Sequence, residues 1–286
     1  MEKCRSWVKK NAYWAVSGVL FVLLAGAVML FENSGKQTYT ALFFGDSIVG
    51  NVRDETSITS LLEEELGVSI YNGAFGGSTL AKRETEERAA SMANSISMVE
   101  LADSMAAEDF SVQNAGITAC TIMEYFPEAV YGFSGIDLNG VQVIFLEHGA
   151  NDYQTGVPLD NPEDPMDIYT FGGALRYVLD VLRENRPDTK IVLCTPTFIW
   201  YIHDWEDCTT KDFGYGGLEA YVNLEIEIAG EYGVDVIDNY HDSGIGGAGS
   251  AFETWSEYTE DGLHLNEQGR QLIAGRIADY VRGQMQ

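Results

Sequence analysis

The chain has 286 residues, 45% of them hydrophobic, which is enough for one sizeable buried core. Its formal net charge of −27 at pH 7 excludes a protein that binds nucleic acid through its phosphates, and disfavours anionic lipid headgroups as partners. The acidity suits neutral substrates, although it also serves to keep an exported domain soluble.

The first 31 residues differ from the rest of the chain. Four lysine and arginine residues at positions 3–10 precede an uncharged apolar run, residues 12–31, which has the roughly 20 residues needed to cross a bilayer. A secretory signal would have a shorter apolar core, of about 7–15 residues, and a cleavage site such as residues 25–27. We therefore predict an uncleaved transmembrane helix, with a cleaved signal as the alternative. The basic residues place the N-terminus in the cytoplasm and the rest of the chain outside.

Residues 32–37 form a short polar linker, and residues 38–286 predict one α/β domain. Five short apolar runs have the uninterrupted character of strands that are buried on both faces. They are residues 39–44, 68–71, 141–146, 190–194 and 234–237. Helical patterns lie between and after them, at residues 57–66, around 84–107, and at 168–184, 217–231 and 266–282.

This alternation predicts parallel βαβ units in a three-layer α/β/α sandwich, with a flavodoxin-like parallel five-stranded sheet. The connection at residues 82–140 is long for one crossover between strands. We interpret it as a helical insertion that covers part of the active face, with extra scaffold as the alternative.

Four polar motifs follow the predicted strands. Ser47 follows the first strand, residues 72–79 follow the second, and residues 149–152 follow the third. Asp261 and His264 come after the last strand and just before the last helix. Ligands of open parallel sheets bind beyond the carboxyl ends of the strands, so these motifs predict one site at that edge.

In order and in content, the four motifs resemble the blocks of the SGNH (GDSL-type) hydrolases. The matching blocks are Gly45-Asp46-Ser47, Gly77 within residues 72–79, Gly149-Ala150-Asn151-Asp152 and Asp261-Gly262-Leu263-His264. The resemblance covers roughly residues 39–280 without the insertion. Its one departure in the first block is Ile48, where the family has leucine, and this exchange leaves the chemistry untouched. The resemblance implies the SGNH fold and a serine hydrolase that needs no metal or organic cofactor.

Ester cleavage assigns a role to each catalytic residue. Ser47 is the candidate nucleophile, which needs a base to take its proton. His264 is the candidate base, because imidazole titrates near neutral pH. Asp261 would hold the imidazole in the correct tautomer and stabilise its charged form. Taken singly, Ser47 is equally consistent with a helix cap and His264 with a surface histidine.

The tetrahedral intermediate carries an oxyanion, which needs donors aimed at it. The candidates are the backbone N–H groups of Ser47 and Gly77 and the side-chain amide of Asn151. Gly76 is the alternative to Gly77, and Asn151 is also a residue type that suits turns. Glycine lets the backbone approach a substrate closely.

Three further residues are candidates for contacting the substrate. His148 adjoins the third motif, and Trp200 and Trp205 lie in the segment after the fourth strand. Aromatic faces of this kind stack on sugar rings, although most aromatic residues simply pack. In the same region, Cys194 and Cys208 could form a disulfide across the predicted loop between them. No cysteine or histidine spacing typical of zinc ligands is present, and no metal site is expected.

The sequence therefore predicts a membrane-anchored, extracytoplasmic bacterial esterase that removes acetyl groups from a carbohydrate. The alternatives are a lipase, lysophospholipase or thioesterase of the same fold, an acyltransferase, or a non-catalytic glycan-binding module. The G-x-S-x-G turn of the general α/β-hydrolases is absent around Ser47.

Overall fold

The computed structural model describes residues 35–83, 93–119, 123–247 and 249–284. Thr38–Gln286 form one compact unit, which contains every helix and strand named below. The predicted membrane span at residues 12–31 lies outside the described residues. Within the part of the chain that is described, no helix is both long and apolar enough to cross a bilayer. The anchor therefore stays a prediction.

The centre of the domain is a five-stranded sheet in which every neighbouring pair of strands is parallel. The strands are β1 (Ala41–Gly45), β2 (Ile70–Asn72), β3 (Val143–Glu147), β4 (Lys190–Cys194) and β7 (Asp235–Ile237). Their order is β2-β1-β3-β4-β7, the order of flavodoxin-like sheets. The predicted parallel five-stranded sheet is confirmed. The sequence did not predict a small antiparallel hairpin formed by β5 (Trp200–Tyr201) and β6 (Glu206–Asp207).

Most predicted strands begin one or two residues too early. Tyr39 and Val68 lie outside β1 and β2, although both pack against the core. In contrast, Gly45 and Glu147 pair as the last residues of β1 and β3, beyond the predicted apolar runs. Apolar side chains report packing against the core, whereas strand ends are set by backbone pairing, so the two boundaries differ.

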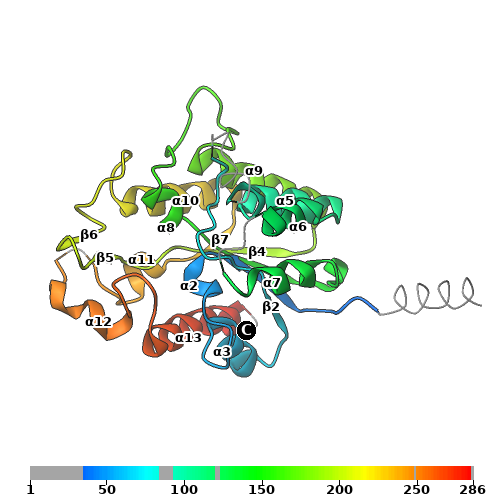
Figure 1. Ribbon diagram of the computed structural model, residues 1–286, viewed down its shortest axis with the longest axis horizontal. Coiled ribbons are helices and arrows are strands. Elements are labelled where there is room, and N and C mark those ends of the chain that lie inside the picture. The colour runs from blue at the N-terminus through cyan, green and yellow to red at the C-terminus, as the bar shows by residue number, and fades with distance from the viewer. Residues whose placement is uncertain (1–34, 84–92, 120–122, 248, 285–286) are drawn as a thin grey trace, which may run out of the picture. The chain divides into compact units, whose positions relative to one another are not determined.

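Helices cover both faces of the sheet (Figure 1). The helices α5 (Met98–Ala107), α9 (Phe171–Asn185) and α10 (Leu218–Tyr232) lie on one face, where α9 contacts the other two. The helices α3 (Ile58–Leu66) and α13 (Glu267–Gln284) contact each other on the opposite face. The arrangement is the three layers that strand–helix alternation predicts.

Local signals in the sequence begin and end these helices. The Ser57 side chain accepts a hydrogen bond from Ser60 N–H at the start of α3, and Thr170 accepts one from Gly173 N–H at the start of α9. Gly67 and Gly233 follow α3 and α10 in the left-handed conformation that commonly terminates a helix.

The segment predicted as an insertion is built into the core. Besides α5 it holds α6 (Ser111–Ala119), α7 (Phe126–Phe133) and a short 3₁₀ turn at Leu138–Gly140. The Phe133 ring of α7 stacks on Phe44 of β1, with ring centroids 5.8 Å apart, and Phe126 packs edge-on against Phe75. Of the helical pattern predicted around residues 84–107, the structure describes α5, whereas residues 84–92 lie outside the described part.

Candidate active site

Ser47 lies where β1 ends and the short helix α2 (Ser47–Gly50) begins. The preceding carboxylate of Asp46 accepts a hydrogen bond from Ile48 N–H at 2.9 Å and so caps this helix. A Cβ atom at Gly45 would lie 3.0 Å from the main-chain oxygen of Glu147, so the strand before the serine packs tightly against β3. The Ser47 side chain is thereby held at the carboxyl edge of the sheet, partly exposed.

Ser47, His264 and Asp261 form one hydrogen-bonded line. The Ser47 Oγ and His264 Nε2 atoms are 3.0 Å apart, although 217 residues separate them in the chain. The His264 Nδ1 atom is 2.7 Å from Asp261 Oδ2. A carboxylate can only accept here, so Nδ1–H donates to Asp261 and Nε2 accepts from the serine hydroxyl. These distances meet the geometry that a nucleophile and its base require.

The Asp261 carboxylate is arranged to stay ionised. Its Oδ1 atom accepts hydrogen bonds from the backbone N–H groups of Leu263, at 3.0 Å, and His264, at 2.8 Å. Partial burial acts to raise the pKa of Asp261, but the hydrogen bonds from the His264 ring and from both N–H groups outweigh it and lower the pKa. The negative charge can therefore stabilise an imidazolium at His264.

Contacts with Trp200 and Arg270 fix the turn that carries His264. Gly262 has a φ of +91°, and its carbonyl accepts a hydrogen bond from Trp200 N–H at 2.8 Å. A Cβ atom at position 262 would overlap the Trp200 carbonyl oxygen, so only glycine fits. The Arg270 guanidinium, which is buried, donates to Leu265 O at 2.7 Å on the other side of the turn.

The backbone N–H groups of the two candidate glycine donors, Gly76 and Gly77, differ in whether they are already hydrogen-bonded. Gly76 N–H donates to the Tyr125 hydroxyl at 2.8 Å, so it is already used. Among the described residues, Gly77 N–H has no hydrogen-bond acceptor, and Gly77 has a φ of +79°. The structure therefore leaves Gly77, rather than Gly76, as the available backbone donor on this loop.

Asn151 lies in α8 (Ala150–Gln154), and its Nδ2 atom donates to Asp46 Oδ2 at 3.0 Å. Burial raises the pKa of Asp46 to about 6, against hydrogen bonds from Ile48 N–H and Asn151 that lower it. The neighbouring Asp152 is buried and accepts from Leu80 N–H at 2.8 Å and from Ala81 N–H at 3.0 Å. Helix α8 thus connects Asp46, which precedes the candidate nucleophile Ser47, to the loop that carries Gly77.

Sequence reasoning missed two side chains that hold this loop. The Arg53 guanidinium donates to the main-chain oxygens of Asn72, at 3.0 Å, and Ala74, at 2.6 Å. It also lies 4.1 Å from the centre of the Tyr125 ring, which itself binds Gly76 N–H. Tyr125 belongs to the segment interpreted as an insertion, and no local pattern marks it as part of a site.

The three residues expected to contact substrate lie in different environments. His148 is 3% exposed, and its Nε2 atom is 3.3 Å from Ser78 Oγ; burial lowers its pKa to about 3. The expectation that it contacts substrate is not met by this position, because the ring has almost no surface. Trp200 is also 3% exposed and packs against Phe198. In contrast, Trp205 is 73% exposed and stacks on Phe252, with ring centroids 4.9 Å apart.

The disulfide interpretation is wrong. Cys194 and Cys208 are both buried and both free. Cys194 ends β4 within the core, whereas the Cys208 sulfur accepts a hydrogen bond from Ile199 N–H at 3.3 Å and lies 3.8 Å from the Tyr240 hydroxyl. The two thiols serve as small core side chains.

Cavities at the two ends of the sheet differ in character. A cavity of about 220 Å³ lies beside Asp261 and Leu263 and is lined by Gln154 and residues 199–204. A larger one, of about 450 Å³, lies beyond α8 and is lined largely by polar residues. An apolar cavity of about 280 Å³ lies at the opposite end, where β1, β3 and β4 begin, against α13. Among the described residues, no cluster of three or more histidine, cysteine or acidic side chains is placed to hold a metal.

The profile of the GDSL-like lipase/acylhydrolase family matches residues 43–272. The chain belongs to this family. The resemblance to the SGNH hydrolases is thereby confirmed, and the family is one of ester-hydrolysing enzymes. No curated protein matches the sequence.

Several solved structures share the fold of this GDSL-family domain. A protein from Lactobacillus plantarum is 20% identical, with a TM-score of 0.58 over 86% of this chain and 98% of its own. A possible lipase from Chitinophaga pinensis is 18% identical, with a TM-score of 0.55 over 86% and 98%. Est24, a carbohydrate acetylesterase from Sinorhizobium meliloti, is 16% identical, with a TM-score of 0.53 over 87% and 99%. At these identities the likeness shows the fold.

Proposed function

We propose that the protein is a serine esterase that removes short acyl groups, acetyl above all, from a carbohydrate. The observation that carries the proposal is the hydrogen-bonded line from Asp261 through His264 to Ser47. A pure binding module has no use for a base held against a serine hydroxyl and an acid held against the base.

In this mechanism Ser47 Oγ attacks the ester carbonyl carbon while its proton passes to His264 Nε2. The charge on the imidazolium is balanced by Asp261. Donors for the oxyanion are the N–H groups of Ser47 and Gly77 and the second amide hydrogen of Asn151. His264 then returns the proton to the departing alcohol, which leaves an acyl group on Ser47. A water molecule, deprotonated by His264, releases that acyl group as the acid and restores the serine.

The cavities favour a short acyl group over a long one. A long acyl chain needs an apolar cavity that starts at the nucleophile. The cavity beside Asp261 mixes apolar side chains such as Ile202 and Leu263 with the polar Gln154, and its volume is only about 220 Å³. The more apolar cavity, of about 280 Å³, lies at the far end of the sheet. This arrangement supports an esterase of small acyl groups and speaks against the lipase and lysophospholipase alternatives.

The exposed ring of Trp205 favours a carbohydrate. It lies in the turn between β5 and β6, next to residues 199–204 that line the cavity at Asp261. Trp205 has a φ of +57°, which residues with a side chain rarely adopt. Its ring is 73% exposed, with one side stacked on Phe252. Exposed indole rings stack on the apolar faces of sugars. The carbohydrate acetylesterase Est24 has the same fold.

The proposal includes the place of action that the sequence predicts. The apolar run at residues 12–31 would anchor the chain in the cell membrane, with the esterase domain on the outer side.

Hydrolysis of p-nitrophenyl acetate by the full-length protein, purified in detergent, tests the proposal. Ser47→Ala should lower kcat by at least about 10³-fold, because the nucleophile is lost. Ser134→Ala, which alters an exposed hydroxyl at the end of α7, is the matched control and should leave kcat unchanged. Unchanged turnover in Ser47→Ala would refute the catalytic assignment.

Acyl-chain and acceptor dependence test the finer parts of the proposal. p-Nitrophenyl octanoate should be cleaved more slowly than the acetate, and the opposite order would favour a lipase. Transfer of the acetyl group to an added sugar, in preference to water, would favour an acyltransferase.

A further inference from the structure

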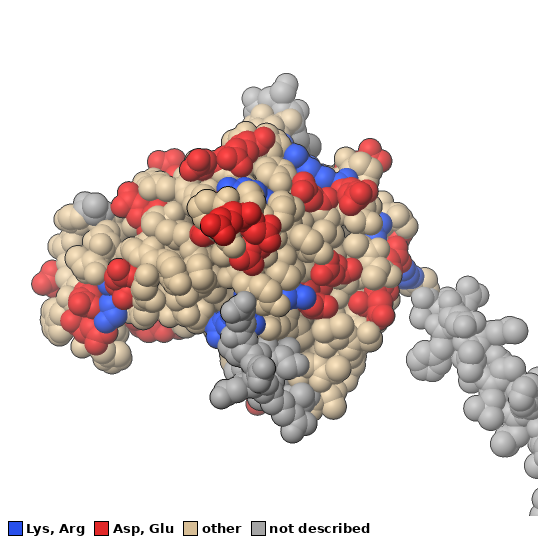
Figure 2. All heavy atoms as spheres, turned by 90° about the horizontal axis from the view of Figure 1, so that it is seen from above, with Lys and Arg blue, Asp and Glu red and all other residues tan. Residues whose placement is uncertain are grey.

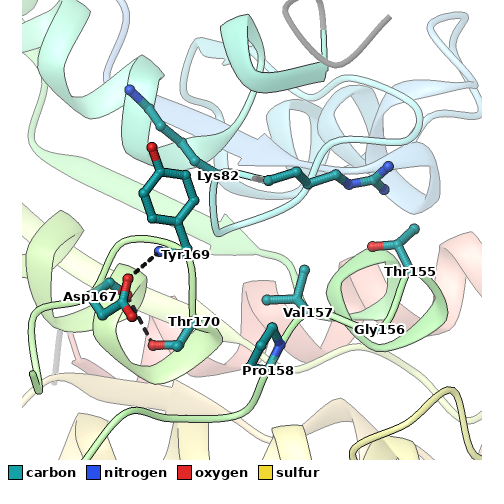
Figure 3. Close-up of a pocket in the computed structure, with 9 residues that line it drawn as sticks. Lys82, Thr155, Gly156, Val157, Pro158, Asp167, Tyr169 and Thr170 are labelled. Atoms are coloured by element: carbon teal, nitrogen blue, oxygen red, sulfur yellow. Dashed lines mark hydrogen bonds between the residues drawn. The ribbon is translucent and has the colours of Figure 1, made fainter. Parts of the chain in front are cut away.

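The cavity of about 450 Å³ beyond α8 has no role in the mechanism above. Its lining comes from three segments that are distant in the chain: residues 82–83, 155–158 and 167–170. Figure 3 shows Lys82 on one side, Val157 and Pro158 on the opposite side, and the Thr155 side chain at one end. Backbone, hydroxyl and charged groups share the walls about equally with apolar carbons.

Two walls of this cavity are formed by segments that follow the candidate oxyanion donors Asn151 and Gly77 in the chain. Thr155 lies one helical turn, about 6 Å, beyond Asn151 in the chain, and its hydroxyl donates to Asn151 O at 2.7 Å. The other wall follows the Gly77 loop, which the buried carboxylate of Asp152 holds at Leu80 and Ala81. The cavity is therefore walled by the same two segments that carry the candidate oxyanion donors.

The cavity carries basic side chains in a chain that has few of them. There are 17 lysine and arginine residues against 44 aspartate and glutamate residues. Figure 2 shows acidic side chains spread over one face of the domain with fewer basic ones between them. Such a surface repels anions, so an acidic substrate would need a local cation to bind.

Lys82 and Asp167 already have partners. The Lys82 ammonium forms an ion pair with Glu100. The Asp167 carboxylate accepts hydrogen bonds from Asn161 Nδ2 at 2.9 Å and from Tyr169 N–H at 3.0 Å, the second of which is drawn in Figure 3. These charges serve to hold the walls of the cavity.

Arg83 is different. Its backbone is fixed by two hydrogen bonds with the Asn94 side chain, at 2.8 and 3.0 Å. Its Nε atom is buried and has no hydrogen-bond partner, and within the described part of the chain its guanidinium forms no ion pair. Its charge acts at longer range on the buried Asp152 carboxylate and helps to lower the pKa of that group, against the larger effect of burial, which raises it. Burying a donor without an acceptor is costly, so an unsatisfied charged donor at a cavity wall indicates a missing acceptor.

We propose that this cavity binds an anionic group of the substrate, a carboxylate or a phosphate, through Arg83 while the ester lies on Ser47. The proposal rests on the esterase function proposed above and adds a substrate class to it: acylated acidic sugars. Guanidinium binds both oxyanions with paired hydrogen bonds, so the two kinds of anion are separated by experiment.

Three acetylated methyl glucosides test the proposal, because they differ only at carbon 6: a neutral hydroxymethyl, a carboxylate and a phosphate. The full-length protein should release acetate from at least one anionic substrate with a kcat/KM about tenfold or more above the neutral one. Arg83→Gln should remove this preference, whereas its kcat/KM for the neutral substrate should change by less than about twofold. The anionic substrate whose kcat/KM decreases most in Arg83→Gln identifies the anion that the cavity binds.

Two variants make the outcome specific. Arg282→Gln removes the same charge from the surface of α13 and should leave the preference unchanged. Arg83→Lys keeps the charge without the paired donors, and it should retain part of the preference; it also replaces Arg83→Gln should that variant not fold. A wild-type protein without any anionic preference would overturn the inference, as would equal losses for all three substrates in Arg83→Gln or a loss of preference in Arg282→Gln. Absence of p-nitrophenyl acetate hydrolysis in the wild type would instead refute the esterase function itself.

Discussion

The side-chain amide of Asn151 donates a hydrogen bond to the carboxylate of Asp46, 3.0 Å away and 105 residues distant in the chain. The second oxygen of Asp46 accepts from Ile48 N–H, in the helix that starts with Ser47. One buried carboxylate therefore orients both the helix of the candidate nucleophile Ser47 and a candidate oxyanion donor. In the proposed mechanism Asp46, which is 1% exposed, would act as a positioning residue.

Asp46→Asn should lower kcat about tenfold to a hundredfold with little change in KM. The single oxygen of the asparagine amide cannot replace both carboxylate oxygens, which accept hydrogen bonds from Ile48 N–H and from Asn151. If Asp46 acts through Asn151, the loss in a double variant with Asn151→Ala should be smaller than the sum of the two single losses. Steady-state kinetics with p-nitrophenyl acetate measure all three variants. Strict additivity would show that Asp46 affects catalysis by another route.

Gly262→Ala should abolish most activity. A methyl group there would overlap the Trp200 carbonyl oxygen, and the φ of +91° is unfavourable for alanine. The turn would have to shift, and it carries both Asp261 and His264. Gly275→Ala, in α13, is the matched control: its new Cβ atom meets no neighbouring atom, so activity should persist and stability should rise by about 0.5–1 kcal/mol.

Stability should decrease as the pH rises from about 4 towards neutrality. Burial raises the pKa of Asp46 and of Asp152 to about 6, and burial followed by the nearby Asp46 charge raises that of Glu147 well above its usual value. A group whose pKa is raised by folding binds more protons in the folded state than in the unfolded state. Its contribution to the free energy of unfolding is therefore largest below its unfolded-state pKa and decreases as the pH rises to its folded-state pKa. For each aspartate the loss is roughly 3 kcal/mol.

Urea unfolding at several pH values measures this dependence. Glu147→Gln should flatten the decrease between about pH 4.5 and pH 7, because it removes one group with a raised pKa. Glu253→Gln, which alters an exposed side chain, should leave the slope unchanged. A free energy of unfolding that rises over this pH range would contradict the prediction.

Local features of the sequence predicted the sheet and the ends of several helices. Apolar runs are visible without any tertiary information, because strands of a parallel sheet are buried on both faces. The pairing of Asp261 with His264 also follows from a spacing of three residues, which one turn can close. Helix caps such as Ser57 and Thr170 are equally local.

Contacts between distant segments could not be predicted in this way. Gly76 and Gly77 are equivalent in the sequence, and only Tyr125, from the segment interpreted as an insertion, distinguishes them by binding Gly76 N–H. His148 looks like a site residue because it adjoins the third motif, yet the neighbouring segments bury it. Cys194 and Cys208 flank one loop, but their side chains have separate surroundings in the core.

The sequence by itself determined that a serine, an acid and an imidazole stand after strands of one parallel sheet, because strand patterns and short spacings are local. The tertiary structure decided that Ser47 and His264, 217 residues apart, lie 3.0 Å from each other. It also decided that Arg83 and Thr155, 72 residues apart in the chain, line one cavity, with the Arg83 Nε atom unsatisfied. Distance, burial and hydrogen-bond satisfaction depend on which segments pack together, and no local pattern in the chain records that packing.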